Sequence, residues 1–142
     1  MENKILDPVL GELIWDKMLE QWCGKVRLST GQTAKIYISA DETQNSNFIL
    51  QASKIFEKIR AEEYEIRQFA VQNLQESLID AWNTEEMVSE YEFCRRIQPN
   101  SIHIYLDKRA EIYYNDDDLV GGHEIVVGID EYGRLDDAFI TG

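Results

Sequence analysis

Residues 101–114 read SIHIYLDKRAEIYY, and the alternation in this stretch decides the fold class. Apolar residues occupy every second position of residues 102–106, and the same period of two returns at residues 110–114. Successive side chains of a β-strand point to opposite faces, so this period predicts two strands that each bury one face. The short polar segment between the two runs predicts a tight connection, as in an antiparallel hairpin.

The residues that follow continue this pattern to the end of the chain. Residues 115–118 predict a tight acidic loop, and residues 123–129 alternate again. Glu131, Tyr132 and Gly133 are a second turn signal, after which residues 135–141 predict a final strand. Short strands joined by tight turns form antiparallel meanders, so we expect no parallel β-α-β crossover.

The first 42 residues also have β periodicity. Residues 22–29 and 33–39 alternate on either side of a turn signal that contains Gly31, which predicts a second hairpin. A less regular strand is predicted at residues 9–15. The outward face of the hairpin carries Lys25, Arg27 and Lys35, which suggests either a small basic patch or an ordinary solvated sheet face.

The middle of the chain is helical. Apolar residues recur at helical spacing from residue 48 to residue 59, stop at Glu62 and Glu63, and resume every four residues from Ile66 to Trp82. This pattern predicts two helices, or one bent helix, with a change of direction near residues 60–65. A third, short helix is predicted at residues 87–97. Its apolar side consists of Met87, Val88, Tyr91, Cys94 and Ile97.

These segments predict one α+β domain over residues 1–142. Residues 1–42 supply N-terminal strands, residues 43–98 the helices and residues 99–142 a C-terminal β-meander. We expect an antiparallel sheet of about six or seven strands, with two to three helices inserted mid-chain and packed on one face.

The charge of the chain is strongly negative and unevenly distributed. The 142 residues contain 27 acidic and 14 basic residues, for a formal net charge of −13. Residues 99–142 hold ten acidic and three basic residues, so more than half of that charge lies in the last third. Such a chain repels the phosphate backbone, and we expect no binding to nucleic acid.

The sequence predicts neither a targeting segment nor a membrane-spanning helix. Asp7 and Pro8 interrupt the only apolar run near the N-terminus, so no signal peptide is predicted. No apolar stretch approaches the roughly 18 residues of a transmembrane helix, and we expect a cytoplasmic protein without membrane partners.

Cys23 and Cys94 lie far apart and outside any CxxC pair. We expect reduced, mostly buried thiols, with a disulfide or a reactive nucleophile as alternatives.

The search for catalytic and metal-binding motifs mostly fails. The sequence contains no phosphate-binding loop, no dinucleotide fingerprint and no nucleophile elbow. The acidic loop at residues 115–118 fails the spacing of an EF-hand, because its sixth and twelfth positions are Val120 and Val126. We therefore expect a solvated hairpin loop, with weak Ca²⁺ or Mg²⁺ binding as the alternative, expect no metal or cofactor elsewhere, and assign no catalytic residue. His103 and His123 with nearby carboxylates are the best acid–base groups available.

A protein-binding surface is the alternative that the acidic third supports. Tyrosines beside carboxylates are typical of such surfaces, because rigid aromatic rings anchor a partner while charges steer it. Half-buried sheet tyrosines are an equally simple interpretation. The candidate binding residues are Asp107, Glu111, Tyr113, Asp116, Asp117, Asp118, Asp130 and Glu131.

Four short segments carry a resemblance to a known family. They are residues 93–97 (FCRRI), residues 101–104 (SIHI), residues 110–116 (AEIYYND) and residues 119–123 (LVGGH). Together they resemble an uncharacterised bacterial family of small acidic domains, catalogued as a domain of unknown function. The resemblance implies an α+β fold and a bacterial cytoplasmic protein, and it implies no activity or catalytic residue.

Three hypotheses for function follow. The first is a non-catalytic module that binds a basic protein, in its sharpest form an immunity-type protein that neutralises a basic toxin such as a nuclease. The second is an enzyme of unrecognised type that uses His103 or His123. The third is a structural protein that self-associates through an edge strand. The oligomeric state is open at this point.

Overall fold

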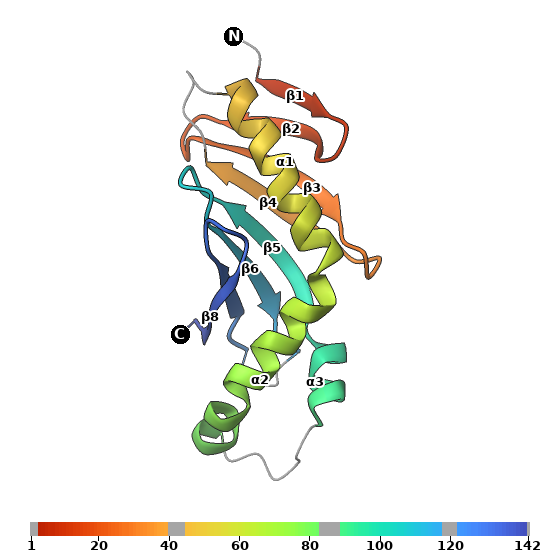
Figure 1. Cartoon of the computed structure of the whole chain (residues 1–142), viewed down its shortest axis with the longest axis vertical. Coiled ribbons are helices and arrows are strands. Elements are labelled where there is room, and N and C mark those ends of the chain that lie inside the picture. Colours follow the sequence, from red (N-terminus) through yellow and green to blue (C-terminus); the bar gives the residue numbers. More distant parts are fainter. Residues whose placement is uncertain (1–2, 40–44, 83–88, 118–121, 142) are drawn as a thin grey trace.

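A computed structural model describes residues 3–39, 45–82, 89–117 and 122–141. Its elements follow the predicted order of strands, helices and strands (Figure 1). The strands are β1 (Lys4–Asp7), β2 (Gly11–Asp16), β3 (Gln21–Arg27), β4 (Thr33–Ser39), β5 (Gln98–Ile104), β6 (Ala110–Asn115), β7 (Ile125–Ile129) and β8 (Leu135–Ile140). The helices are α1 (Asn45–Ala61), α2 (Glu63–Trp82) and α3 (Glu90–Arg96).

The eight strands form one sheet in sequence order, β1 to β8. The expected α+β class is confirmed, but the expected six or seven strands were too few. The additional strand, β1, has only four residues and pairs with β2 from Lys4↔Ile14 to Asp7↔Gly11. Four residues are too few to show a convincing period of two, so only the pairing with β2 identifies the strand.

A second correction concerns the direction of pairing at the centre of the sheet. Neighbouring strands pair antiparallel except β4 and β5, which run parallel from Lys35↔Ser101 to Ile38↔Ile104. A parallel pair needs a long crossover connection, and the three helices between β4 and β5 provide it. The period of two is the same in parallel and antiparallel strands, so the sequence pattern could not distinguish them.

The helical segment follows the prediction closely. α1 ends at Ala61 and α2 begins at Glu63, which confirms the change of direction predicted near residues 60–65. Ser89 caps α3, whose Phe93 and Cys94 are buried. Tyr91, however, is 69% exposed, so the predicted apolar side of this helix was wrong at that position. Met87 and Val88 lie outside the described residues.

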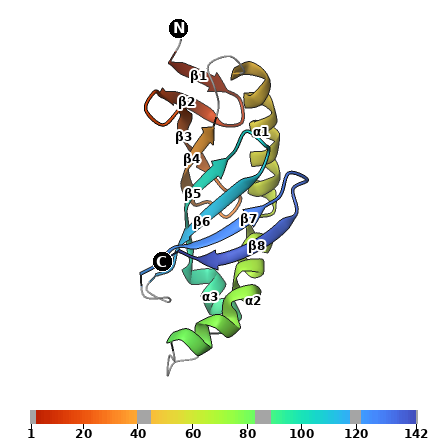
Figure 2. The ribbon, with the colours of Figure 1, turned by 90° about the vertical axis from the view of Figure 1, so that its left-hand side faces the viewer.

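The core lies between the sheet and the helices. Figure 1 shows α1 and α2 crossing one face of the sheet, and Figure 2 shows α1 beside the strands in the perpendicular view. Every second sheet residue on this side is buried together with Phe56 of α1 and Ile66 of α2. The central sheet positions are Ile36, Ile38, Ile102, Ile104, Ile112, Tyr114, Ile125 and Val127. None of the described helices is both long and apolar enough to cross a membrane.

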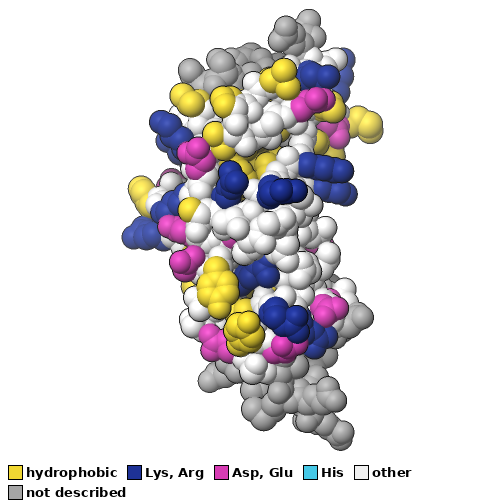
Figure 3. Space-filling view, turned by 90° about the vertical axis from the view of Figure 1, so that its right-hand side faces the viewer, with side chains coloured by type: hydrophobic (Ala, Val, Ile, Leu, Met, Phe, Trp, Pro, Cys, Tyr) yellow, Lys and Arg dark blue, Asp and Glu magenta, His cyan; other side chains and the backbone are white. Residues whose placement is uncertain are grey.

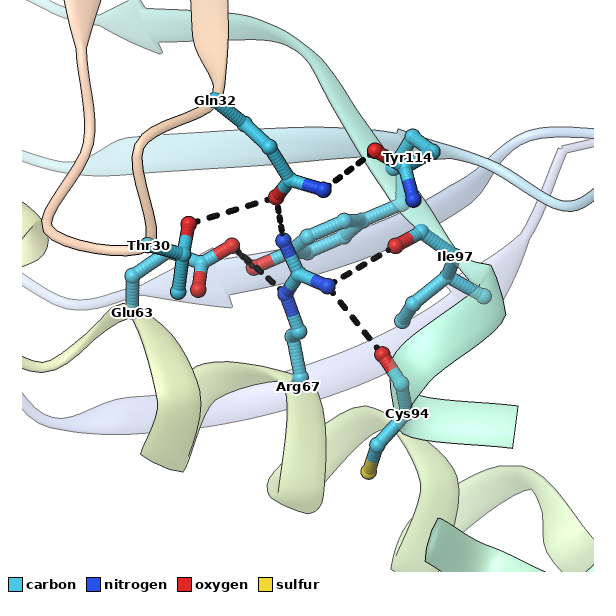
Figure 4. Close-up of polar contacts among 8 residues, drawn as sticks. Thr30, Gln32, Glu63, Arg67, Cys94, Ile97 and Tyr114 are labelled. Carbon is cyan, nitrogen blue, oxygen red and sulfur yellow. Dashed lines mark hydrogen bonds and ion pairs between the residues drawn. The ribbon is translucent and has the colours of Figure 1, made fainter. Parts of the chain in front are cut away.

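A buried ion pair joins α2 to both halves of the sheet (Figure 4). Arg67 Nε donates to Glu63 Oε1 at 2.7 Å, and both side chains are almost fully buried. Arg67 Nη1 donates to the carbonyl oxygens of Cys94 in α3 at 3.1 Å and of Ile97, which caps the end of α3, at 3.0 Å. Its Nη2 donates to Gln32 in the β3–β4 connection. One guanidinium therefore ties α2, the end of α3 and the β3–β4 turn together.

Tyr114 on β6 completes this cluster. Its ring lies under the Arg67 guanidinium, 5.7 Å from the ring centroid, and its hydroxyl donates to Glu63 Oε1 at 3.4 Å. Burial, together with the Glu63 carboxylate, raises the pKa of Tyr114 well above its ordinary value, so the hydroxyl remains a donor. Glu63 Oε2 is buried and accepts no hydrogen bond from any described residue.

Candidate functional site

The face of the sheet opposite α1 and α2, called here the open face, carries a stripe of apolar and aromatic side chains. The strand register places each member of the stripe beside the next, except between β5 and β6, where His103 pairs with Glu111 and its ring contacts the ring of Tyr113 diagonally. Its members are Ile14, Cys23, Tyr37, His103, Tyr113, Val126 and Phe139. Ile14 and Phe139, at its two ends, are exposed. The four members from Cys23 to Tyr113 are half-buried and Val126 is fully buried, so the exposed apolar ends of the stripe are the parts suited to a partner.

His103 lies at the centre of the stripe, between two tyrosine rings. Its ring stacks on Tyr37 with the centroids 4.9 Å apart, and Tyr113 lies at the same distance in a tilted arrangement. His103 Nε2 is 3.3 Å from Ser101 Oγ. Burial lowers the pKa of His103, and the nearby carboxylates Glu111 and Glu124 oppose this shift only in part. The aromatic setting therefore favours a neutral imidazole.

This setting makes the stability of the fold depend on pH. The folded-state pKa of His103 lies below its ordinary value of 6.5, so the unfolded chain binds the proton more tightly. The contribution of His103 to the free energy of unfolding is therefore fully present above pH 6.5 and is lost as pH falls through the folded-state value. We expect His103→Phe, which keeps a stacked ring, to reduce the fall in stability between pH 7 and pH 5. Urea titrations of both proteins at several pH values measure this difference, and equal pH slopes would contradict it.

Glu111 on β6 is held by two tyrosine hydroxyls. Tyr105 donates to Glu111 Oε1 at 2.6 Å, and Tyr113 donates to the same oxygen at 3.3 Å. Burial first, and then the carboxylate itself, raises the pKa of both tyrosines, so both hydroxyls stay protonated at neutral pH. Glu111 Oε2 accepts no hydrogen bond from the described residues.

Beside Glu111 the open face is hollowed, over a volume of about 500 Å³. Asp136 and Asp137 of β8 face Glu111 across this hollow, and Arg109 reaches Asp136 at 2.9 Å. Gly128 makes the space possible, because a Cβ there would lie 2.9 Å from Asp136 Oδ1. We call this site the acidic hollow; its side-chain lining is Tyr105, Arg109, Glu111, Asp136, Asp137 and Phe139, with Gly128 between them.

The other half of the open face is basic. Lys25 and Lys35 lie directly opposite each other on β3 and β4, and Arg27 follows on β3. The outward-facing basic residues predicted from the sequence are thus confirmed as neighbours.

Cys23 lines a wider hollow on this half, and burial and Asp16 raise the pKa of its thiol. Both cysteines are free thiols, as expected, and a raised pKa makes Cys23 a poor nucleophile.

The structure separates the predicted binding residues into three places. Glu111 and Tyr113 lie on the open face. Asp107 lies in the β5–β6 turn, and Asp130 and Glu131 lie in the β7–β8 turn at the same end of the sheet. Asp116 and Asp117 follow β6 at the opposite end, and Asp118 lies outside the described residues. The candidate residues therefore do not form one continuous surface.

The loop after β6 is not the free acidic surface that the sequence suggests. Asp116 is only 5% exposed, and its Oδ2 accepts a hydrogen bond from the backbone N–H of Gly122 at 2.9 Å. Asp117 is paired with Arg96 of α3 at 2.8 Å. Both carboxylates thus stabilise the loop locally. The acidic residues that sequence reasoning missed are Asp136 and Asp137, which become neighbours of Glu111 only through the β6–β7–β8 pairing.

His103 and His123 do not form a pair. His103 contacts Ser101 and the surrounding tyrosines, and no hydrogen bond or ring contact among the described residues joins it to His123. The same part of the chain contains no group of three or more His, Cys, Asp or Glu side chains able to hold a metal ion.

Comparison with known proteins identifies one similarity. The model of a family described as an uncharacterized protein conserved in bacteria matches residues 7–140 of the chain. No curated protein and no solved structure matches it.

Proposed function

The chain belongs to the DUF2262 family of bacterial proteins, and from the geometry of its open face we propose that it is a non-catalytic module that binds a basic protein. The observation that carries the proposal is the acidic hollow. Three carboxylates line it, and Arg109 pairs with only one of them, Asp136. A lysine or arginine of a partner would complete this charge arrangement.

The walls of the hollow suit the stem of such a side chain. Tyr105 and Phe139 flank the carboxylates, and Phe139 is 39% exposed. A few residues dominate the binding energy at protein interfaces, and they are often aromatic side chains next to buried or half-buried charges. The partner's aliphatic stem would pack between the two rings while its cationic head binds Glu111 Oε2 and Asp137.

An immunity-type role is the sharpest form of this proposal. A net charge of −13 attracts a basic toxin over distances of about a Debye length, roughly 10 Å at moderate salt. Opposite fields raise the association rate and suppress wrong partners. This role implies a cytoplasmic protein whose partner binds on the face of the sheet opposite α1 and α2. On the side that Figure 3 shows, Lys and Arg are at least as prominent as Asp and Glu, although acidic residues are nearly twice as numerous as basic ones in the whole chain.

The enzyme hypothesis has weaker support from the geometry. His103 has a hydroxyl neighbour, Ser101, but Ser101 is only 7% exposed and therefore poorly placed to attack a substrate. No described carboxylate accepts a hydrogen bond from His103, and Glu111 already accepts from Tyr105 and Tyr113.

Self-association through the edge strands β1 and β8 is the third hypothesis, and the mass of the protein in solution tests it.

The test compares capture of a partner by wild type and by Glu111→Gln/Asp137→Asn. Both tagged proteins are incubated with lysate and secreted fraction of the source bacterium at low and high salt, and captured proteins are identified by mass spectrometry. We expect wild type to retain a stoichiometric basic protein that high salt releases. The double variant should lose it at both salt concentrations, because the hollow no longer carries its free charges.

The matched control is Glu57→Gln/Glu65→Gln, which removes the same charge from exposed positions on α1 and α2. This control should capture the partner like wild type. Equal capture by the hollow variant and the control would show that net charge, not the hollow, is responsible. A captured partner without excess positive charge would refute the proposal.

A further inference from the structure

A second cavity lies on the helix side of the sheet, away from the acidic hollow. It has a volume of about 210 Å³ and lies between α1, the start of α2 and the turns after β5 and β7. Figure 2 shows the β7–β8 hairpin reaching the side of α1. Its floor is apolar and consists of Ile55, Ile59, Ile66, Ile129 and Leu135. Nothing in the proposed function uses this cavity.

The rim of the cavity is rich in ammonium groups. Lys54 and Lys58 reach it from α1, and Lys108 reaches it from the β5–β6 turn. None of the three forms an ion pair with any described residue. Three lysines around one apolar floor are unusual in a chain in which acidic residues are nearly twice as numerous as basic ones.

Carboxylates also line the rim. Asp130 is already bound by Arg134 Nε at 3.2 Å and by the backbone N–H groups of Tyr132 and Arg134. The hydrogen bonds to its carboxylate lower the pKa of Asp130, so it remains ionised and engaged with its own turn. The three lysines are thus matched in number by Glu62, Asp130 and Glu131, and Arg134, which pairs with Asp130, brings the cations of this group to one more than the carboxylates.

A glycine leaves room for one of the lysines. Gly133 has φ +80°, a conformation that favours glycine, and a Cβ at this position would lie 2.5 Å from Lys58 Nζ. The Lys58 side chain therefore lies directly over the β7–β8 turn. The missing side chain at Gly133 thus leaves room for the Lys58 ammonium group beside the cavity.

We propose that this cavity binds a small amphiphilic anion, a carboxylate with a short aliphatic chain. The isoleucines and the leucine of the floor would take the apolar chain, and Lys54, Lys58 and Lys108 would bind the carboxylate. Ligand sites usually measure about 300–1,000 Å³, so a cavity of this size selects a short chain. An aliphatic amine fits poorly, because the lysine ammonium groups of the rim carry charge of the same sign.

Isothermal titration with octanoate, 1-octanol and octylammonium tests the proposal on the whole protein. We expect saturable binding of octanoate at one site per chain, and binding of the other two compounds weaker by about tenfold or more. Lys54→Gln/Lys58→Gln should weaken octanoate binding by about tenfold, because two of the three cations are lost. Both positions are exposed, so the fold should persist.

Two further variants complete the design. Lys17→Gln/Lys25→Gln makes the same charge change at exposed positions on the other side of the sheet and should bind octanoate like wild type. Ile55→Phe fills the half-buried side of the floor and should abolish binding, with circular dichroism as the check on folding. Equal affinity for octanoate and octylammonium, or no saturation by octanoate at millimolar concentration, would overturn the proposal. None of these outcomes depends on a protein partner, so the proposed function is tested separately.

Discussion

Arg67→Ala is expected to lower the free energy of unfolding by about 3–5 kcal/mol. The substitution leaves the Glu63 carboxylate fully buried without its cation, and Tyr114 remains its only described donor. It also removes the donor of two backbone carbonyl groups, those of Cys94 and Ile97. Removal of one partner from a buried pair costs more than the pair contributes, because the remaining charge is not solvated.

Urea titration followed by circular dichroism measures this effect as a lower midpoint at similar slope. Arg60→Ala on the exposed side of α1 is the matched control and should change stability by no more than about 0.5 kcal/mol. The double variant Glu63→Leu/Arg67→Ala should recover part of the loss, because it removes the isolated carboxylate. A loss below about 1 kcal/mol for Arg67→Ala would mean that water reaches Glu63 and that the pair is not buried in solution.

Trp22→Ala is expected to cost a similar amount, about 3–5 kcal/mol. Trp22 on β3 is 1% exposed, and its ring lies 5.1 Å from that of Trp15 on β2. Truncation leaves a large cavity between these strands and the helices, and it also removes the aromatic contact. The loss should appear as faster unfolding or a lower urea midpoint for the whole domain, because one sheet spans all eight strands.

Trp22→Phe separates the volume of the side chain from its polar atom. Trp22 Nε1 is buried and has no hydrogen-bond partner among the described residues, so the indole N–H is itself unfavourable there. Phenylalanine removes this N–H and keeps most of the ring, so we expect a much smaller loss than for alanine. Tyr91→Ala at an exposed position of α3 is the control. Equal losses for the alanine and phenylalanine variants would contradict this account.

Local periodicity was sufficient for most of the elements. The stretch at residues 101–114 predicts β5 and β6 because alternation reports which side chains face the core, and that property needs no knowledge of neighbouring strands. The break in the apolar stripe at Glu62 and Glu63 likewise predicts the boundary between α1 and α2. The same break hid the role of Glu63, since an acidic residue in a sequence suggests solvent, whereas this one is fully buried against Arg67.

The candidate site depends on contacts between distant residues, which local patterns do not contain. Glu111 was a candidate from the sequence, but Asp136 and Asp137 join it only because β7 and β8 pair in one particular register. Asp116 and Asp117 were equally plausible from composition, yet Gly122 and Arg96 engage them. A strand pattern shows the direction in which a side chain points and leaves open which residue lies beside it. The identity of the neighbouring residue is set by the packing of the whole sheet on its helices. The same packing decides that β4 and β5 pair parallel and not antiparallel.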